Sequence, residues 1–229
     1  MLKIVYFFLI ILFFYQISHS QRVLSQLWSD LSVSKKVSKK LNLSLGLTNR
    51  LGEYGLTTVF SQFSVKYSPT NWLRPSIDYR LISSRDNNGN YLINHRINSN
   101  IQFSKDVKRF NFQLRLRYQY SFSKLTQSNY DPEFDLAYRI KPSISYDINN
   151  CILSPLISVD YFYNPINSAL GNRFTRARYF IGTTFEMTGP HELTIGYIYD
   201  KQINLPDPLQ RHIASITYNY KLKSVKKKD

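Results

Sequence analysis

The stretch that decides the fold is FNFQLRLRYQY, residues 110–120, in which polarity alternates at every position. The even positions carry phenylalanine, leucine or tyrosine, and the odd positions carry Asn111, Gln113, Arg115, Arg117 and Gln119. A period of two is typical of a β-strand with two different faces. A soluble sheet turns such an apolar face toward a core. A membrane barrel turns it toward lipid and keeps the arginines in a wet interior.

The same alternation recurs along the chain, from LNLSLGLTN at 41–49 to SITYNYKL at 215–222. Counted with the opening stretch LWSDLSVS at 27–34, it gives eleven candidate strands of roughly nine to thirteen residues. A tilted strand needs about that length to cross a bilayer, whereas strands of soluble domains usually have about five to six residues. We therefore predict an all-β, antiparallel transmembrane β-barrel of 10–12 strands. Because single-chain bacterial barrels usually have an even number of strands, we expect ten or twelve.

The connections between these strands alternate in length. Short turns are expected at 35–40, 68–71, 105–109, 147–150 and 187–190, and longer loops at 51–56, 83–90, 121–132, 164–173 and 201–210. This sorting is typical of an outer-membrane barrel with short periplasmic turns and longer extracellular loops. The 18 tyrosines crowd the strand ends, as in the aromatic belts at membrane interfaces.

The two ends of the chain differ from its middle. Residues 1–20 combine Lys3, an apolar run and small residues before a plausible cleavage site, which predicts a secretory signal peptide. We assign residues 21–222 to the barrel and 223–229 to a basic C-terminal tail. The net charge of +15 would suggest nucleic acid in another context, but the export signal argues against it. Cys151 is the only cysteine, so no internal disulfide is expected, and we expect it to fill a small apolar place at the start of a strand.

Several phrases carry a resemblance to a known family: LWSDLSVSKKVSKKLNLSLGLTNR, YSPTNWLRPSIDYRLI and FQLRLRYQY. Together they resemble the outer-membrane barrels catalogued as domain of unknown function 2490 (DUF2490), found mostly in the Bacteroidetes. The resemblance covers nearly the whole chain after the signal peptide. It implies a barrel in the outer membrane of a Gram-negative bacterium and no established activity.

The polar faces of the predicted strands carry both charges. The basic residues expected to line the lumen are Arg74, Arg80, Arg96, Arg115, Arg117, Arg139, Lys141, Arg176 and Arg178. The acidic residues expected there are Asp78, Asp135, Asp160 and Glu186, and Glu192 and Asp200 share the same face. One interpretation is an internal ion-pair network that plugs the barrel. The other is a cationic lumen that selects anions, since rings of arginine and lysine favour anionic solutes in pores.

The sequence contains no pattern of a known enzyme or metal site. It has no HExxH, no paired His or Cys and no glycine-rich phosphate loop, so we expect no cofactor and no metal. His95 with Ser83 or Ser84 could be imagined as a lipid hydrolase in the barrel wall, but a histidine of the interfacial belt is the simpler interpretation. We expect no enzyme. The expected function is a narrow arginine-lined channel or binding barrel for small anionic solutes. The alternative is a plugged structural or assembly barrel that acts through its loops and protein partners. Expected partners are outer-membrane lipid and lipopolysaccharide and the barrel-assembly machinery, with no nucleic acid.

Overall fold

The structure is a computed structural model that describes residues 22–86, 88–122, 136–165, 171–205 and 207–223. The predicted signal peptide at 1–20 and most of the basic tail lie outside these residues. The strands are β1 (Val23–Lys36), β2 (Leu41–Gly52), β3 (Gly55–Tyr67), β4 (Leu73–Arg85), β5 (Tyr91–Val107), β6 (Phe110–Phe122), β7 (Leu136–Tyr146), β8 (Leu153–Asn164), β9 (Arg173–Glu186), β10 (His191–Gln202) and β11 (Gln210–Leu222). Among the described residues, no helix is long and apolar enough to span a membrane, a finding that has no bearing on strands.

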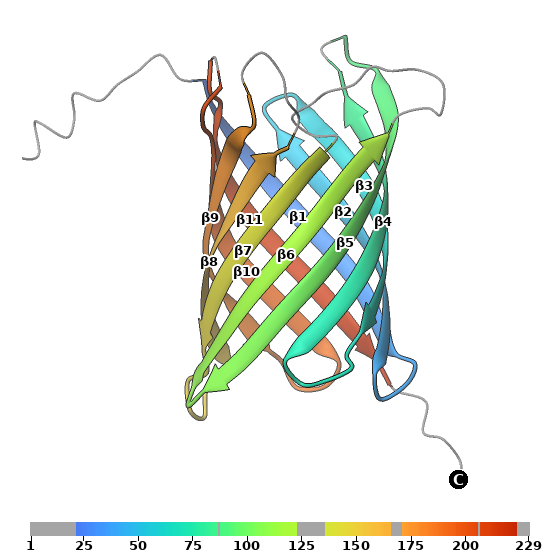
Figure 1. Ribbon diagram of the computed structural model, residues 1–229, viewed down its shortest axis with the longest axis vertical. Helices are drawn as coiled ribbons and strands as arrows, with labels where there is room; N and C mark the ends of the chain where they lie inside the picture. The colour runs from blue at the N-terminus through green and yellow to red at the C-terminus, as the bar shows by residue number, and fades with distance from the viewer. Residues whose placement is uncertain (1–21, 87, 123–135, 166–170, 206, 224–229) are drawn as a thin grey trace, which may run out of the picture.

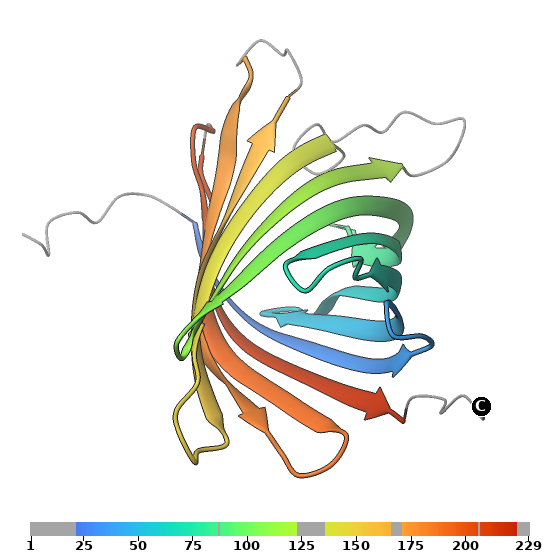
Figure 2. The ribbon, with the colours of Figure 1, turned by 60° about the horizontal axis from the view of Figure 1, so that its bottom comes forward.

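These eleven strands form one closed barrel (Figures 1 and 2). Strands that follow each other in the chain pair antiparallel, and β1 and β11 close the barrel by pairing in parallel from Val23↔Gln210 to Lys35↔Leu222. The expectation of ten or twelve strands is therefore wrong, and so is a purely antiparallel sheet. A parallel closing pair allows an odd number, and it places the start of β1 and the end of β11 at opposite rims (Figure 1).

The strands turn their polar faces inward and their apolar faces outward. On β6, Leu114 and Leu116 are 38% and 39% exposed, whereas Arg117 and Gln119 are 7% and 2% exposed. The other strands follow the same rule, so aliphatic and aromatic side chains cover the outside and most of the buried side chains are polar or charged. This arrangement is the inverse of a soluble domain, whose apolar side chains are buried.

Aromatic and histidine side chains gather near both rims on the outer face. Where β8 ends and β9 begins, Tyr163 and Phe174 lie 5.3 Å apart between ring centroids. Near the lower rim, Phe110 and Tyr146 lie 4.8 Å apart, and His191 contacts Tyr220 at 5.3 Å. Leucines and isoleucines such as Leu116, Ile101 and Ile140 occupy the zone between, in one cross-strand row.

Two predictions about connections are wrong. Residues 51–56 form no long loop, because β2 and β3 pair up to Gly52↔Gly55 and leave only Glu53 and Tyr54 in the turn. Gly55 permits this tight turn because its φ is 82°, a backbone conformation that residues with a Cβ rarely adopt. Cys151 fills no apolar place, since β8 begins only at Leu153 and the free thiol lies exposed in the turn before it.

A small apolar cluster lies among the inward side chains. Trp28 of β1, Ile198 of β10 and Ile213 of β11 are buried together, with Phe180 of β9 packed against them. The Phe180 ring fits over Gly196, since a Cβ added there would lie 2.5 Å from ring carbons of Phe180. An aromatic ring that covers glycines of a neighbouring strand is a recognised device for stabilising a curved sheet.

We expect Gly196→Ala to destabilise the barrel by about 1–3 kcal/mol, because the added methyl group collides with the Phe180 ring and with the carbonyl oxygen of Ile181. Gly46→Ala is the matched control, since a Cβ at this inward position of β2 meets its nearest atom only at 3.4 Å. Urea unfolding of both variants in detergent measures the difference. Equal midpoints for the two variants would contradict the tight packing of Phe180.

Candidate functional site

Among the described residues, Asp200 of β10 is the carboxylate with the most ion pairs. Its carboxylate forms ion pairs with Arg176 at 3.4 Å, with Arg211 at 4.0 Å and, more closely, with Arg178. Asp200 is fully buried. Strand register explains the cluster, because Asp200 is the direct cross-strand partner of Arg178 on β9 and of Arg211 on β11. Three guanidinium groups thus share one carboxylate.

Two further aspartates hold arginines inside the barrel. Asp160 of β8 pairs with Arg139 and also with Arg115 at 3.2 Å. Asp78 of β4 pairs with Arg117 of β6 at 3.1 Å, across the intervening β5. Asn100 of β5 connects the last two, since its amide group donates to Asp78 at 3.0 Å and its oxygen accepts from the Arg117 Nε. All these side chains lie on inward positions of their strands.

Several arginines of the lumen stack on aromatic rings at inward positions. The Trp28 ring lies 4.0 Å from the guanidinium carbon of Arg50 and 4.8 Å from that of Arg178. Phe162 lies 4.1 Å from the guanidinium carbon of Arg139. Arginine is the cation best suited to such stacking, because its guanidinium group is planar and weakly hydrated. The aromatic rings therefore order guanidinium groups inside the lumen without neutralising them.

The upper part of the lumen contains a cavity of about 1230 Å³. Its walls include three carboxylates, Asp30, Asp160 and Asp200, and eleven basic side chains: Arg50, Arg80, Arg85, Arg96, Arg115, Arg117, Arg139, Lys141, Arg176, Arg178 and Arg211. The excess of positive charge is large even if every carboxylate is ionised. Such a cavity attracts anions and repels cations.

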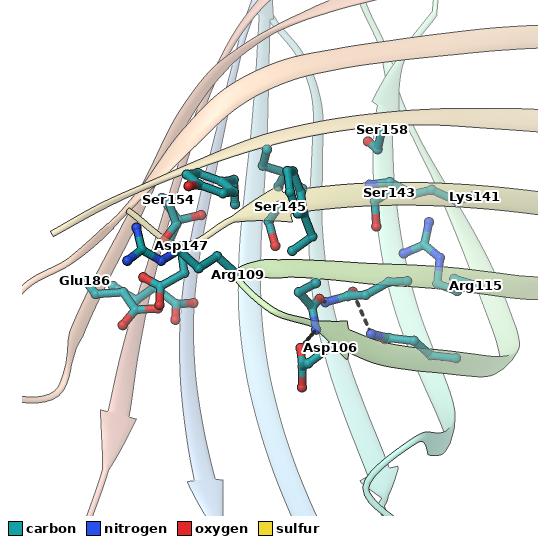
Figure 3. Close-up of a pocket in the computed structure, with 18 of the residues that line it drawn as sticks. Asp106, Arg109, Arg115, Lys141, Ser143, Ser145, Asp147, Ser154, Ser158 and Glu186 are labelled. Carbon is teal, nitrogen blue, oxygen red and sulfur yellow. Dashed lines mark hydrogen bonds between the residues drawn. The ribbon is translucent and has the colours of Figure 1, made fainter. Parts of the chain in front are cut away.

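The lower part contains a second cavity of about 790 Å³ with nearly balanced charge. Its walls carry five basic residues, Arg74, Lys108, Arg109, Arg115 and Lys141, and four acidic residues, Asp106, Asp147, Glu186 and Glu192. Figure 3 shows Arg109, Asp147 and Glu186 near one another, well apart from Arg115 and Lys141, with serines of β7 and β8 between them. Positive charge in the lumen is therefore concentrated in the upper cavity.

The two cavities meet at four residues that line both: Arg115, Lys141, Leu156 and Ser158. Arg115 and Lys141 are direct cross-strand partners on β6 and β7. The Arg115 side chain is 26% exposed despite its ion pair with Asp160, whereas that of Arg117 is 6% exposed. A solute that moves from one cavity to the other would thus pass the cations Arg115 and Lys141.

The residues predicted for the lumen are found in three situations. Five arginines are ion-paired: Arg115, Arg117, Arg139, Arg176 and Arg178, held by Asp78, Asp160 and Asp200. Others line a cavity: Arg80 and Arg96 the upper one, Arg74 and Glu186 the lower one, and Lys141 both. Asp135 lies outside the described residues.

Sequence reasoning missed several residues of this site. Arg50 and Arg211 line the upper cavity, and so do the inward aromatic residues Trp28, Phe60 and Phe162. Each shares the even or odd parity of polar residues on its strand, as Trp28 does with Asp30. That parity was the available signal. An aromatic residue on a polar face nevertheless looks like an exception to alternation until its guanidinium partner on another strand is known.

The three histidines of the described residues, His95, His191 and His212, lie on the outer face near the rims. The Tyr79 hydroxyl and His95 Nδ1 are 2.7 Å apart, and the His95 ring stacks on Phe122 with centroids 5.2 Å apart. Tyr197 and His212 form the same diagonal pair on β10 and β11. Ser84 points into the upper cavity, away from His95. Among the described residues no group of three or more His, Cys, Asp or Glu side chains could hold a metal ion.

Comparison with known proteins identifies a family. No curated protein matches the sequence at a significant level. A family model with the description "Protein of unknown function (DUF2490)" matches residues 25–208, from the beginning of β1 to the connection before β11. That range includes most of β1, all of β2 to β10, and every carboxylate of the three ion-pair clusters. The chain therefore belongs to the DUF2490 family.

Proposed function

We propose that this protein is an outer-membrane β-barrel whose cationic lumen binds and passes small anionic solutes. The outer face supports membrane placement, because a band of exposed leucine and isoleucine lies between two aromatic rims. Strands of 11 to 17 residues are long enough to cross a bilayer at a tilt. An exposed apolar surface of this extent would promote aggregation in water.

The observation that carries the functional proposal is the charge of the upper cavity. Eleven basic side chains face three carboxylates in a space of about 1230 Å³. Each of those carboxylates already has partners, since Asp160 and Asp200 accept arginines and Asp30 accepts the hydroxyl groups of Thr48 and Thr217. A diffusing anion therefore finds cations whose charge the protein does not balance.

The proposal includes an orientation. The rim with the end of β11 faces the periplasm, and the rim with the start of β1 faces outward, in contact with lipopolysaccharide. Insertion in this orientation would depend on the barrel-assembly machinery of the outer membrane. In this orientation an anion from outside enters the cationic cavity first and then the nearly neutral one.

Conductance of single refolded barrels in planar bilayers tests the proposal. Under a salt gradient, we expect a reversal potential of the sign that marks anion selectivity. The double variant Arg115→Gln with Lys141→Gln should move the reversal potential toward zero, because it removes the two cations shared by both cavities. Asp147→Asn and Lys108→Gln near the lower rim are control variants with small expected effects. Cation-selective openings of the unmodified barrel would contradict the proposal.

A second candidate function is a closed barrel that acts through its loops and partners. It is favoured by the three buried aspartate clusters and by the apolar cluster around Trp28, whose side chains lie inside the lumen. Barrels that are inserted in the bilayer but silent would support this candidate and reject the channel.

The proposal assigns no catalytic role. The only hydroxyl group bonded to His95 in the described structure is that of Tyr79, and the inward Ser84 lies on the other face of the wall. His95→Ala should therefore leave any esterase signal of the purified barrel unchanged.

A further inference from the structure

Two arginines of the upper cavity differ from the six that aspartates hold. Arg50 of β2 and Arg80 of β4 line this cavity, and neither forms an ion pair with a described carboxylate. Asp30 lines the same cavity as Arg50 and accepts hydrogen bonds from Thr48 and Thr217. Six other arginines of the cavity are held by aspartates. Arg50 and Arg80 thus carry positive charge that no neighbouring carboxylate directly balances.

Both guanidinium groups are positioned by the same aromatic ring. The guanidinium carbon of Arg80 lies 4.7 Å from the Phe60 centroid and that of Arg50 lies 5.3 Å from it. Arg50 also lies over Trp28 at 4.0 Å. A stacked guanidinium group keeps its N–H edges available for a ligand, because the stacking uses only its face. The two arginines therefore face one region of the cavity.

The hydrogen bonds of the pair are incomplete. The Arg80 Nε donates to Gln62, its direct cross-strand partner. The Arg50 Nε is buried and has no hydrogen-bond partner among the described residues. Arg50 is also repelled by Arg80, Arg96 and Arg178. A buried cation without a counterion is strongly unfavourable, so a ligand that brings negative charge and acceptors to this place would be bound.

We propose that Arg50 and Arg80 form a binding site for phosphate and phosphorylated solutes. The inference rests on the proposed function and names its solute class. Two guanidinium forks match the charge of one phosphate dianion, and each fork can donate two parallel hydrogen bonds to its oxygens. Trp28 and Phe60 form an aromatic wall beside the site, against which the organic part of a phosphate ester packs.

Calorimetric titration of the full refolded barrel with inorganic phosphate tests the site. We expect saturable binding of one phosphate per barrel. Arg50→Gln and Arg80→Gln should each weaken it roughly tenfold to a hundredfold, since each removes charged hydrogen-bond donors. The phosphate affinity of Arg50→Lys should lie between those of the unmodified barrel and Arg50→Gln, because lysine keeps the charge and lacks the planar fork. Arg74→Gln is the matched control, with the same loss of charge in the lower cavity and no expected effect on affinity.

Three results would overturn the site: no saturable phosphate binding, full affinity in Arg50→Gln, or an equal loss in Arg74→Gln. Thermal unfolding of the unmodified barrel tests the site even if a variant fails to fold. Phosphate should raise the midpoint of the unmodified barrel above that in chloride of equal ionic strength, and equal midpoints would count against the site. Anion conductance without phosphate binding rejects the site and keeps the channel. Phosphate binding without conductance rejects the channel and keeps the site.

Discussion

Replacing Asp200 by asparagine is expected to destabilise the barrel by about 3–5 kcal/mol, the usual cost of removing one partner from a buried ion pair. Asparagine has nearly the same shape, so the change removes charge without opening a cavity. Arg176, Arg178 and Arg211 would lose the carboxylate that they share. Urea unfolding in detergent, followed by tryptophan fluorescence, measures the cost, and Trp28 is a sensitive reporter because it stacks with Arg178.

The control for this variant is Asp147→Asn in an exposed turn at the lower rim, for which we expect a change below about 0.5 kcal/mol. A second comparison adds Arg178→Gln to Asp200→Asn and should recover part of the loss, because one of the unbalanced cations is then absent. A cost below about 1 kcal/mol for Asp200→Asn would mean that anions from solution replace the carboxylate. That outcome would contradict a tightly held cluster and favour a wet lumen.

The faces of the strands were predictable from sequence, because alternation is a local property. In FNFQLRLRYQY the odd positions were expected in the lumen, and Arg115, Arg117 and Gln119 all line its upper cavity. Alternation also counted eleven candidate strands, the number in the structure, but the closure of a barrel with an odd number of strands was not predictable in the same way. It depends on whether β1 can pair with β11 in parallel, and those strands are joined only through the whole of the chain between them. A general preference for even numbers could not detect that pairing.

The pairing of charges inside the barrel could not be predicted from the sequence either. Arg117 meets Asp78 two strands away, and their contact depends on the register of β4, β5 and β6 together. Alternation predicts that both side chains point inward but not that they lie at the same height. Arg50 shows the opposite case, a cation on the polar face with aromatic rings in place of a carboxylate. The sequence therefore indicated a charged lumen without distinguishing balanced from unbalanced arginines.

Leu116→Arg is expected to cost about 2–4 kcal/mol if the outer face lies in lipid, the range for arginine at the midplane of a membrane barrel. Leu116 is the middle residue of β6 and is 39% exposed on the outer face. Leu114→Arg, two residues closer to the lower rim, should cost less, because the penalty falls with distance from the midplane. Folding into lipid vesicles, measured by urea titration, gives both values.

Ser143→Arg is the control that separates the two faces of the wall. Ser143 of β7 points into the lower cavity, whose walls are polar and whose charge is nearly balanced. We expect this variant to lose less than about 1 kcal/mol, since a surface charge in a polar setting changes stability little. Equal costs for Leu116→Arg and Ser143→Arg would show that the outer apolar face does not meet lipid. The proposed channel would then lose its location, whereas the phosphate site at Arg50 and Arg80 would still be open to test, because it depends only on the lumen.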